Sequence, residues 1–151
     1  MLLYENPISG NCYKVRLLLA HLGLPYERRT MDVVDRSNRL EVLGDLNPAL
    51  RVPTLVLDDG RPLAESNAIL WYLGEGTRFV PDDAYARAKT LQWMFFEQYK
   101  HEPGIAVVRF WVSISDDPPP AADIEKLKPY PSVRSWLARV AAQPGVVPIT
   151  A

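Results

Sequence analysis

Residues Arg51 to Leu73 read RVPTLVLDDGRPLAESNAILWYL, and this stretch decides the fold. Residues 53–57 and 61–64 are short, mostly apolar runs on either side of an Asp-Asp-Gly sequence, which favours a tight reversal between two strands. Ser66 follows the second run and can cap a helix that is rich in large apolar residues and ends near Gly74. The stretch therefore predicts two antiparallel strands followed by a helix.

The residues before this stretch predict a strand, a helix and a second strand. Residues 2–5 form a short apolar run typical of a buried strand. Between residues 12 and 22, apolar side chains recur with helical spacing, and charged ones such as Arg16 lie off that stripe. Residues 26–31 suit a strand, so the order predicts a right-handed parallel crossover. With a short helix at residues 35–46, the first 75 residues are predicted to form a βαβ–ββα domain.

The residues after Gly74 predict a second, all-α domain. Residues 76–81 are interpreted as a linker between residues 1–75 and residues 82–151. Two acidic residues at the start of the second segment favour the positive end of a helix dipole there. The first helical stretch is expected to pause at Pro103-Gly104, and residues 131–144 are expected to form the last helix.

Composition narrows the classes of function. Seventeen Lys and Arg residues against eighteen Asp and Glu residues leave a net charge of −1 without a dense basic cluster, so nucleic acid is not an expected partner. The single cysteine, Cys12, cannot form an internal disulfide, which favours a reducing compartment and hence the cytoplasm. No signal peptide and no apolar run of membrane-spanning length is apparent, so no membrane partner is expected.

Three ordered motifs resemble the cytosolic glutathione S-transferase family, and bacterial, theta- or nu-like members in particular. They are residues 7–16, PISGNCYKVR, residues 51–55, RVPTL, and residues 65–73, ESNAILWYL. Residues 130–145 also resemble the last helices of bacterial members. The resemblance implies a thioredoxin-like N-terminal domain followed by an all-α C-terminal domain. The latter is expected to be incomplete, because little sequence separates the first helical stretch from the last helix.

The resemblance also implies which residues bind glutathione. A proline in the position of Pro53 is cis in the family, which lets the backbone of Val52 pair with the cysteinyl part of glutathione. Glu65 and Ser66 would hold the γ-glutamyl end beside a helix N-terminus. Arg51 would lie near the glycine carboxylate, for which its fixed charge is suited.

Ser9 and Asn11 are the predicted catalytic residues by the same resemblance. Ser9 matches a serine whose hydroxyl bonds the glutathione sulfur, and Asn11 matches a second polar contact; both are expected just before a helix. A hydroxyl donor and a helix dipole favour thiolate over thiol, and lowering the thiol pKa by ~2 units needs roughly 2.7 kcal/mol. Taken alone, Ser9 and Asn11 would be ordinary loop and capping residues. Cys12 is either a nucleophile or, preferably, a packing residue.

The expected activity is transfer of glutathione, as thiolate, to a small hydrophobic electrophile, as in detoxification. A glutathione-dependent disulfide reductase or peroxidase is one alternative, and a glutathione-binding or partner-binding module without turnover is another. Neither His21 nor His101 has a neighbour at metal-ligand spacing, so no metal is expected. The family implies a homodimer.

Overall fold

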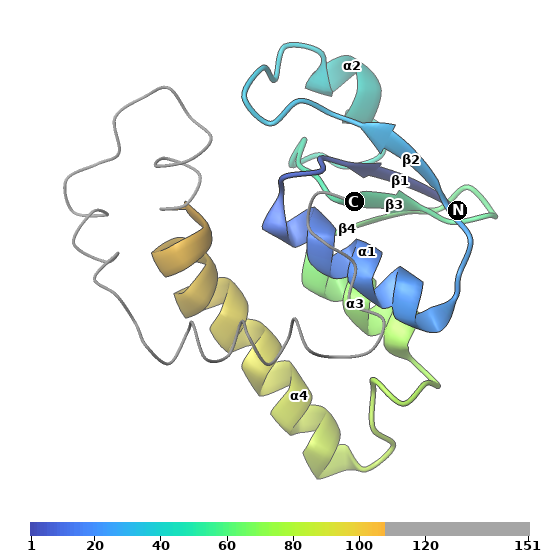
Figure 1. Ribbon diagram of the computed structural model, residues 1–151, viewed down its shortest axis with the longest axis vertical. Coiled ribbons are helices and arrows are strands. Elements are labelled where there is room, and N and C mark those ends of the chain that lie inside the picture. The colour runs from blue at the N-terminus through green and yellow to red at the C-terminus, as the bar shows by residue number, and fades with distance from the viewer. Residues whose placement is uncertain (108–151) are drawn as a thin grey trace. The chain divides into compact units, whose positions relative to one another are not determined.

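The computed structural model describes residues 1–107, and these fall into two compact units, the first ending at Phe79 and the second beginning at Val80. The first unit contains a four-stranded sheet (Figure 1). Its strands, in the order β2-β1-β3-β4, are β1 Leu2–Glu5, β2 Glu27–Thr30, β3 Thr54–Val56 and β4 Pro62–Ala64. β1 runs parallel to β2 and antiparallel to β3, and β3 runs antiparallel to β4.

Three helices cover the two faces of this sheet. They are α1 Gly10–Leu22, α2 Arg39–Leu43 and α3 Ser66–Gly74. In Figure 1, α1 and α3 lie side by side against one face, and α2 lies on the other. The predicted βαβ–ββα order, and with it the thioredoxin-like fold of the N-terminal domain, is confirmed.

Alternating side chains of β1 divide the core between these faces, as the two-residue repeat of a strand requires. Leu3 is fully buried and packs with residues of α1, β3 and α3. Tyr4 points the other way and packs with Met31 and Leu43, the latter from α2. Because β1 is central and buried on both faces, the residues that follow it leave the sheet from a fixed position.

Three helix starts differ from the sequence prediction for local reasons. α1 begins two residues earlier than expected, since Ser9 already supplies the cap. α2 is shorter than residues 35–46, because the side chains of Asp32 and Asp35 accept hydrogen bonds from nearby backbone amides and so hold turns. The prediction that Ser66 caps α3 was wrong: Glu65 occupies the cap position, without a capping hydrogen bond from its side chain, and Ser66 is the first helical residue.

The described part of the second unit is helical from Ala84 onward. α4, Ala84–Phe96, begins as predicted at an acidic cap, where the Asp83 side chain accepts from the amide of Ala86. The expected pause at Pro103 was wrong, because a π-helix, Glu97–Ala106, continues through it. In this wider helix, amides bond carbonyls five residues back, which changes the backbone around a residue that has no amide hydrogen. The predicted helix at residues 131–144 and most of the predicted second domain lie outside the described residues.

Candidate functional site

The first predicted site segment is the loop between β1 and α1. Ser9 is the N-cap of α1, and its Oγ accepts from the backbone amide of Cys12 at 3.4 Å. The Ser9 amide donates to the Asn6 carbonyl, and its carbonyl accepts from the Tyr13 amide. A hydroxyl that accepts one bond keeps its own hydrogen to donate. Ser9 therefore presents a donor at the positive end of a 13-residue helix.

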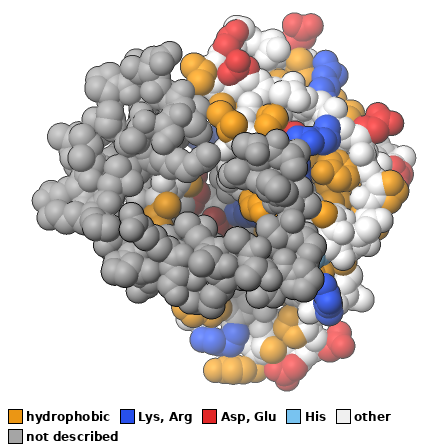
Figure 2. All heavy atoms as spheres, viewed as in Figure 1, with side chains coloured by type: hydrophobic (Ala, Val, Ile, Leu, Met, Phe, Trp, Pro, Cys, Tyr) orange, Lys and Arg blue, Asp and Glu red, His pale blue; other side chains and the backbone are white. Residues whose placement is uncertain are grey.

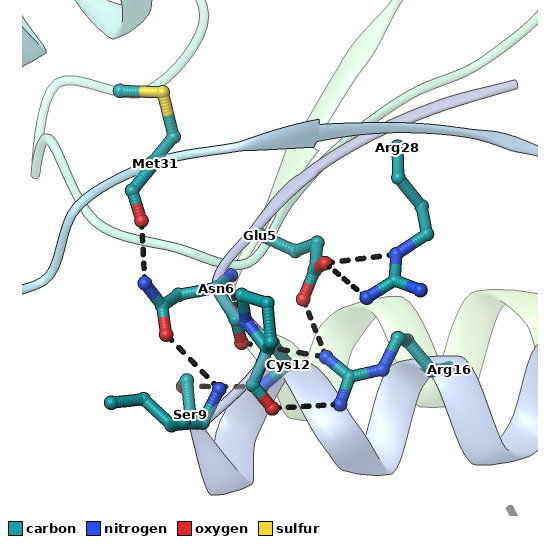
Figure 3. Close-up of polar contacts among 9 residues, drawn as sticks. Glu5, Asn6, Ser9, Cys12, Arg16, Arg28 and Met31 are labelled. Atoms are coloured by element: carbon teal, nitrogen blue, oxygen red, sulfur yellow. Dashed lines mark hydrogen bonds and ion pairs between the residues drawn. The ribbon is translucent and has the colours of Figure 1, made fainter. Parts of the chain in front are cut away.

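Buried polar side chains hold this loop through hydrogen bonds (Figure 3). The Asn6 amide group donates to the Met31 carbonyl at 2.7 Å and accepts from the Ile8 amide at 3.1 Å. Arg16 donates to the Pro7 carbonyl at 2.9 Å and pairs with the carboxylate of Glu5, which is itself fully buried. The loop is thus fixed through both its side chains and its carbonyl groups.

Glu5 and Arg16 were not predicted as functional candidates from the sequence. Arg16 was placed off the apolar stripe of its helix, yet only 2 % of its surface is exposed. The sequence did contain a signal for this pair, namely an acidic residue at the end of an apolar strand and an arginine in the next helix. Buried charges occur where they are paired, so two opposite charges in predicted buried elements could have been matched.

Cys12, whose backbone amide donates to Ser9, has its side chain in the core rather than at the surface. It is fully buried, and its sulfur accepts from the Asn6 amide at 3.4 Å. Burial raises the pKa of the Cys12 thiol above its usual value; hydrogen bonds from Ser9 and Asn6 oppose this, and the Glu5 carboxylate adds to it. A nucleophilic cysteine needs an accessible thiolate, so this environment favours a packing role.

The second predicted segment is the loop before β3, which holds the cis Val52–Pro53 peptide. Asn47 donates to the Arg51 carbonyl at 2.9 Å and to Thr54 Oγ1 at 3.0 Å. Pro53 is buried, Val52 is partly buried and Arg51 is exposed. The loop therefore presents Arg51 to solvent while its backbone is held from within.

Arg39 holds the same loop at an earlier residue. This buried side chain donates to the carbonyls of Leu50 and Asp32 at 2.8 and 2.7 Å. Burial lowers the pKa of the Arg39 guanidinium, and the nearby charges of Arg36 and Arg51 lower it further. Leu50 has a φ of 53°, a backbone region that favours glycine.

The third predicted segment is the junction of β4 and α3. Glu65 is exposed and has a φ of 67°, which is uncommon for a residue other than glycine. Ser66 is buried, and its hydroxyl donates to Oδ1 of Asn11 at 3.4 Å. Asn11 lies in the first turn of α1, not before it as predicted. The contact brings the N-termini of α1 and α3 together.

The strand registers place all three segments at one end of the sheet. Thr54 pairs with Tyr4 on one side and with Ala64 on the other. The chain just after β1, just before β3 and just after β4 therefore leaves the sheet at the same end. We call this end, formed by residues 6–9, 51–53 and 65–66, the site end. It combines the amides of two helix N-termini with polar side chains, which suits an anionic ligand.

Other kinds of site are not found in residues 1–107. These residues contain no group of three or more His, Cys, Asp or Glu side chains placed to hold a metal ion. Within the same range, no helix is both long and apolar enough to cross a membrane. On the face drawn in Figure 2, the described acidic and basic side chains are interspersed rather than gathered by sign.

Comparisons with known proteins agree on one family. Residues 8–75 match the family described as glutathione S-transferase, N-terminal domain. A crystal structure of a possible glutathione S-transferase from Rhodopseudomonas palustris is 32% identical, with a TM-score of 0.87, over 99% of this chain and 98% of that one. Glutathione S-transferase U10 of Arabidopsis thaliana is 33% identical over 64% of this chain.

Two further comparisons set the limits of the likeness. The chain spans 42% of the length of the Arabidopsis protein, and so less than half of it. Ure2p, solved in complex with glutathione, is 22% identical with a TM-score of 0.70, over 93% of this chain and 61% of that one. At that identity the likeness to Ure2p shows a shared fold.

Proposed function

Because this chain belongs to the cytosolic glutathione S-transferase family, we propose that it binds glutathione at the site end and transfers it to a small hydrophobic electrophile. The observation that carries the proposal is the position of Ser9. It caps α1 beside the Asn11–Ser66 contact, so a hydroxyl donor and two helix N-termini lie together. The solved complex of Ure2p with glutathione supports glutathione as the ligand of this fold.

Each part of glutathione has a matching group at the site end. The γ-glutamyl carboxylate is assigned to the α3 amides and to Ser66, whose hydroxyl would turn from Asn11 to the ligand, with Glu65 facing the γ-glutamyl amine. The cysteinyl backbone is assigned to Val52, next to the cis peptide. The glycine carboxylate is assigned to Arg51, whose exposed guanidinium has the planar shape that pairs with a carboxylate.

The chemistry then follows from the pKa of the glutathione thiol. The Ser9 hydroxyl donates to the sulfur, with Asn11 as a second polar contact, and the helix dipole favours the anion. The thiol proton passes to solvent, and a sulfur electron pair forms a bond to the electrophilic carbon. The leaving group departs with its bonding pair. Lowering the thiol pKa by ~2 units requires roughly 2.7 kcal/mol, within reach of one charge-assisted hydrogen bond and a helix terminus.

The alternative chemistry through Cys12 is less well supported. A disulfide reductase would need this thiol to attack a disulfide as thiolate, whereas burial raises the pKa of the thiol. A module that binds glutathione without turnover would share the same contacts. A homodimer, a cytoplasmic location and a second domain over residues 82–151 remain predictions.

The test is conjugation of glutathione to a chromogenic aryl halide by the full chain and two variants. We expect Ser9→Ala to lower the rate about 100-fold, as for loss of one donor to a reacting anion, and Cys12→Ser to keep most of it. Loss of activity in Cys12→Ser with Ser9→Ala unaffected would favour the reductase chemistry. If the parent chain binds glutathione without turnover, the result would favour the alternative of a glutathione-binding module that does no chemistry.

A further inference from the structure

One buried guanidinium, that of Arg16, holds two backbone carbonyls of the loop that carries Ser9. Arg16 lies in the second turn of α1, and its two terminal nitrogens donate to the carbonyls of Pro7 at 2.9 Å and Asn6 at 3.4 Å. Both carbonyls belong to the segment that enters the Ser9 cap (Figure 3). The helix that Ser9 caps therefore also holds, through Arg16, the backbone that leads to Ser9.

A buried carboxylate fixes the orientation of that guanidinium. One oxygen of Glu5 accepts from Arg16, and the other accepts from Arg28 of β2, at 2.9 Å from Nε and 2.8 Å from a terminal nitrogen. Glu5 is the last residue of β1 and is fully buried, so it offers a fixed reference point. A planar guanidinium with one nitrogen on this carboxylate and its other bonds on the loop has little freedom to rotate.

We propose that Arg16 is a positioning residue for the proposed reaction, acting through the Pro7 and Asn6 carbonyls to aim the Ser9 hydroxyl at the glutathione sulfur. This inference rests on the proposed function. Aim matters because a hydrogen bond weakens steeply with angle, and a displacement of about 1 Å at a reacting group can cost 100-fold in rate. Arg16 touches neither glutathione nor the electrophile in this account.

Replacement by lysine separates the positioning role from the charge. In Arg16→Lys, the ammonium group still compensates the buried Glu5, but a single nitrogen cannot keep the carboxylate and both carbonyls in the same fork. Arg28→Lys is the matched control, since it makes the same chemical change on the other oxygen of the same carboxylate. The double variant Glu5→Leu/Arg16→Met is a second probe that removes the buried pair together, a change that such pairs often tolerate.

The measurement is the pH titration of bound glutathione followed by the ultraviolet absorbance of its thiolate, with the affinity for S-methylglutathione measured alongside. We expect Arg16→Lys and the double variant to raise the bound thiol pKa, so that the thiolate fraction below that pKa falls about three- to tenfold. The affinity for S-methylglutathione, which has no thiol to orient, stays within about twofold, showing that the variants are folded.

Two results would overturn the inference while leaving the proposed function in place. One is an unchanged thiol pKa in both the lysine and the double variants. The other is an equal shift in Arg28→Lys, which would assign the effect to the charge of Glu5 rather than to the loop. If Ser9→Ala itself leaves the bound thiol pKa unchanged, both the inference and the role of Ser9 in the proposed function fail.

Discussion

Replacing Asn47 with alanine is expected to loosen the loop that presents Val52. Asn47 is 3% exposed and makes three side-chain hydrogen bonds, two as a donor to the Arg51 carbonyl and Thr54 Oγ1 and one as an acceptor from the Ala49 amide. In Asn47→Ala, the Arg51 carbonyl keeps its bond from Thr54 Oγ1, and the amide of the exposed Ala49 can donate to water instead.

The size of the expected loss of stability follows from what happens to each hydrogen-bond partner. Since each former partner retains another partner or access to water, the loss is close to the net value of the two bonds that Asn47 donates, about 1 kcal/mol each. The free energy of unfolding should therefore fall by about 2 kcal/mol, which lowers Tm by about 4–8 °C for a chain of this length. The slope of the free energy against urea should not change, because the surface exposed on unfolding is the same.

The assay is urea unfolding of the full chain beside a matched control. Asn38→Ala removes the same side chain from an exposed position where it makes no capping hydrogen bond, and should cost less than about 0.5 kcal/mol. Asn47→Ala should also weaken S-methylglutathione binding, because Asn47 bonds Arg51 and Thr54, and Val52 lies between them in the chain. Equal stability of the two variants would refute the argument that these hydrogen bonds hold the loop.

Three further changes have directions set by the structure. Burial raises the pKa of the Cys12 thiol, so the unfolded chain ionises first; the unfolding free energy should fall as pH rises above about 8.5, and urea titrations should show a smaller fall in Cys12→Ala. Equal falls would contradict it. Glu65→Gly should not destabilise the chain, because glycine accepts a φ of 67°, yet it should weaken glutathione binding by calorimetry; a large loss of stability would count against it. Arg39→Met should cost about 2–3 kcal/mol in urea, through its bonds to the Leu50 and Asp32 carbonyls, and a neutral result would show that neither bond matters.

Much of the first unit could be predicted because its signals are local. The apolar run of residues 2–5 coincides with β1, and the Asp-Gly reversal lies between β3 and β4 as predicted. Helix starts were less predictable, since Asp32 and Asp35 side chains compete with the helix for backbone amides. The left-handed backbone of Glu65, which takes the cap of α3 from Ser66, has no signal in the residue type.

The candidate site was predictable where resemblance supplied it and not where long-range pairing did. The motifs named Ser9, Val52 and Ser66, and the strand registers bring their segments to one end of the sheet. The Glu5–Arg16 pair was missed, because helical periodicity treats an arginine as solvent-facing and does not contain its partner eleven residues away. Buried ion pairs depend on two elements packing together, which a single periodic pattern cannot report.

The most direct test of the central claim is calorimetric titration of the full chain with glutathione in buffers of different ionisation enthalpy, which counts the protons released on binding. If the site lowers the thiol pKa by ~2 units from about 8.5, about 0.8 protons should be released near pH 7.5. S-methylglutathione should bind and release none, and Ser9→Ala should release far fewer than the parent chain. Glutathione binding without proton release, or no binding at all, would contradict the account.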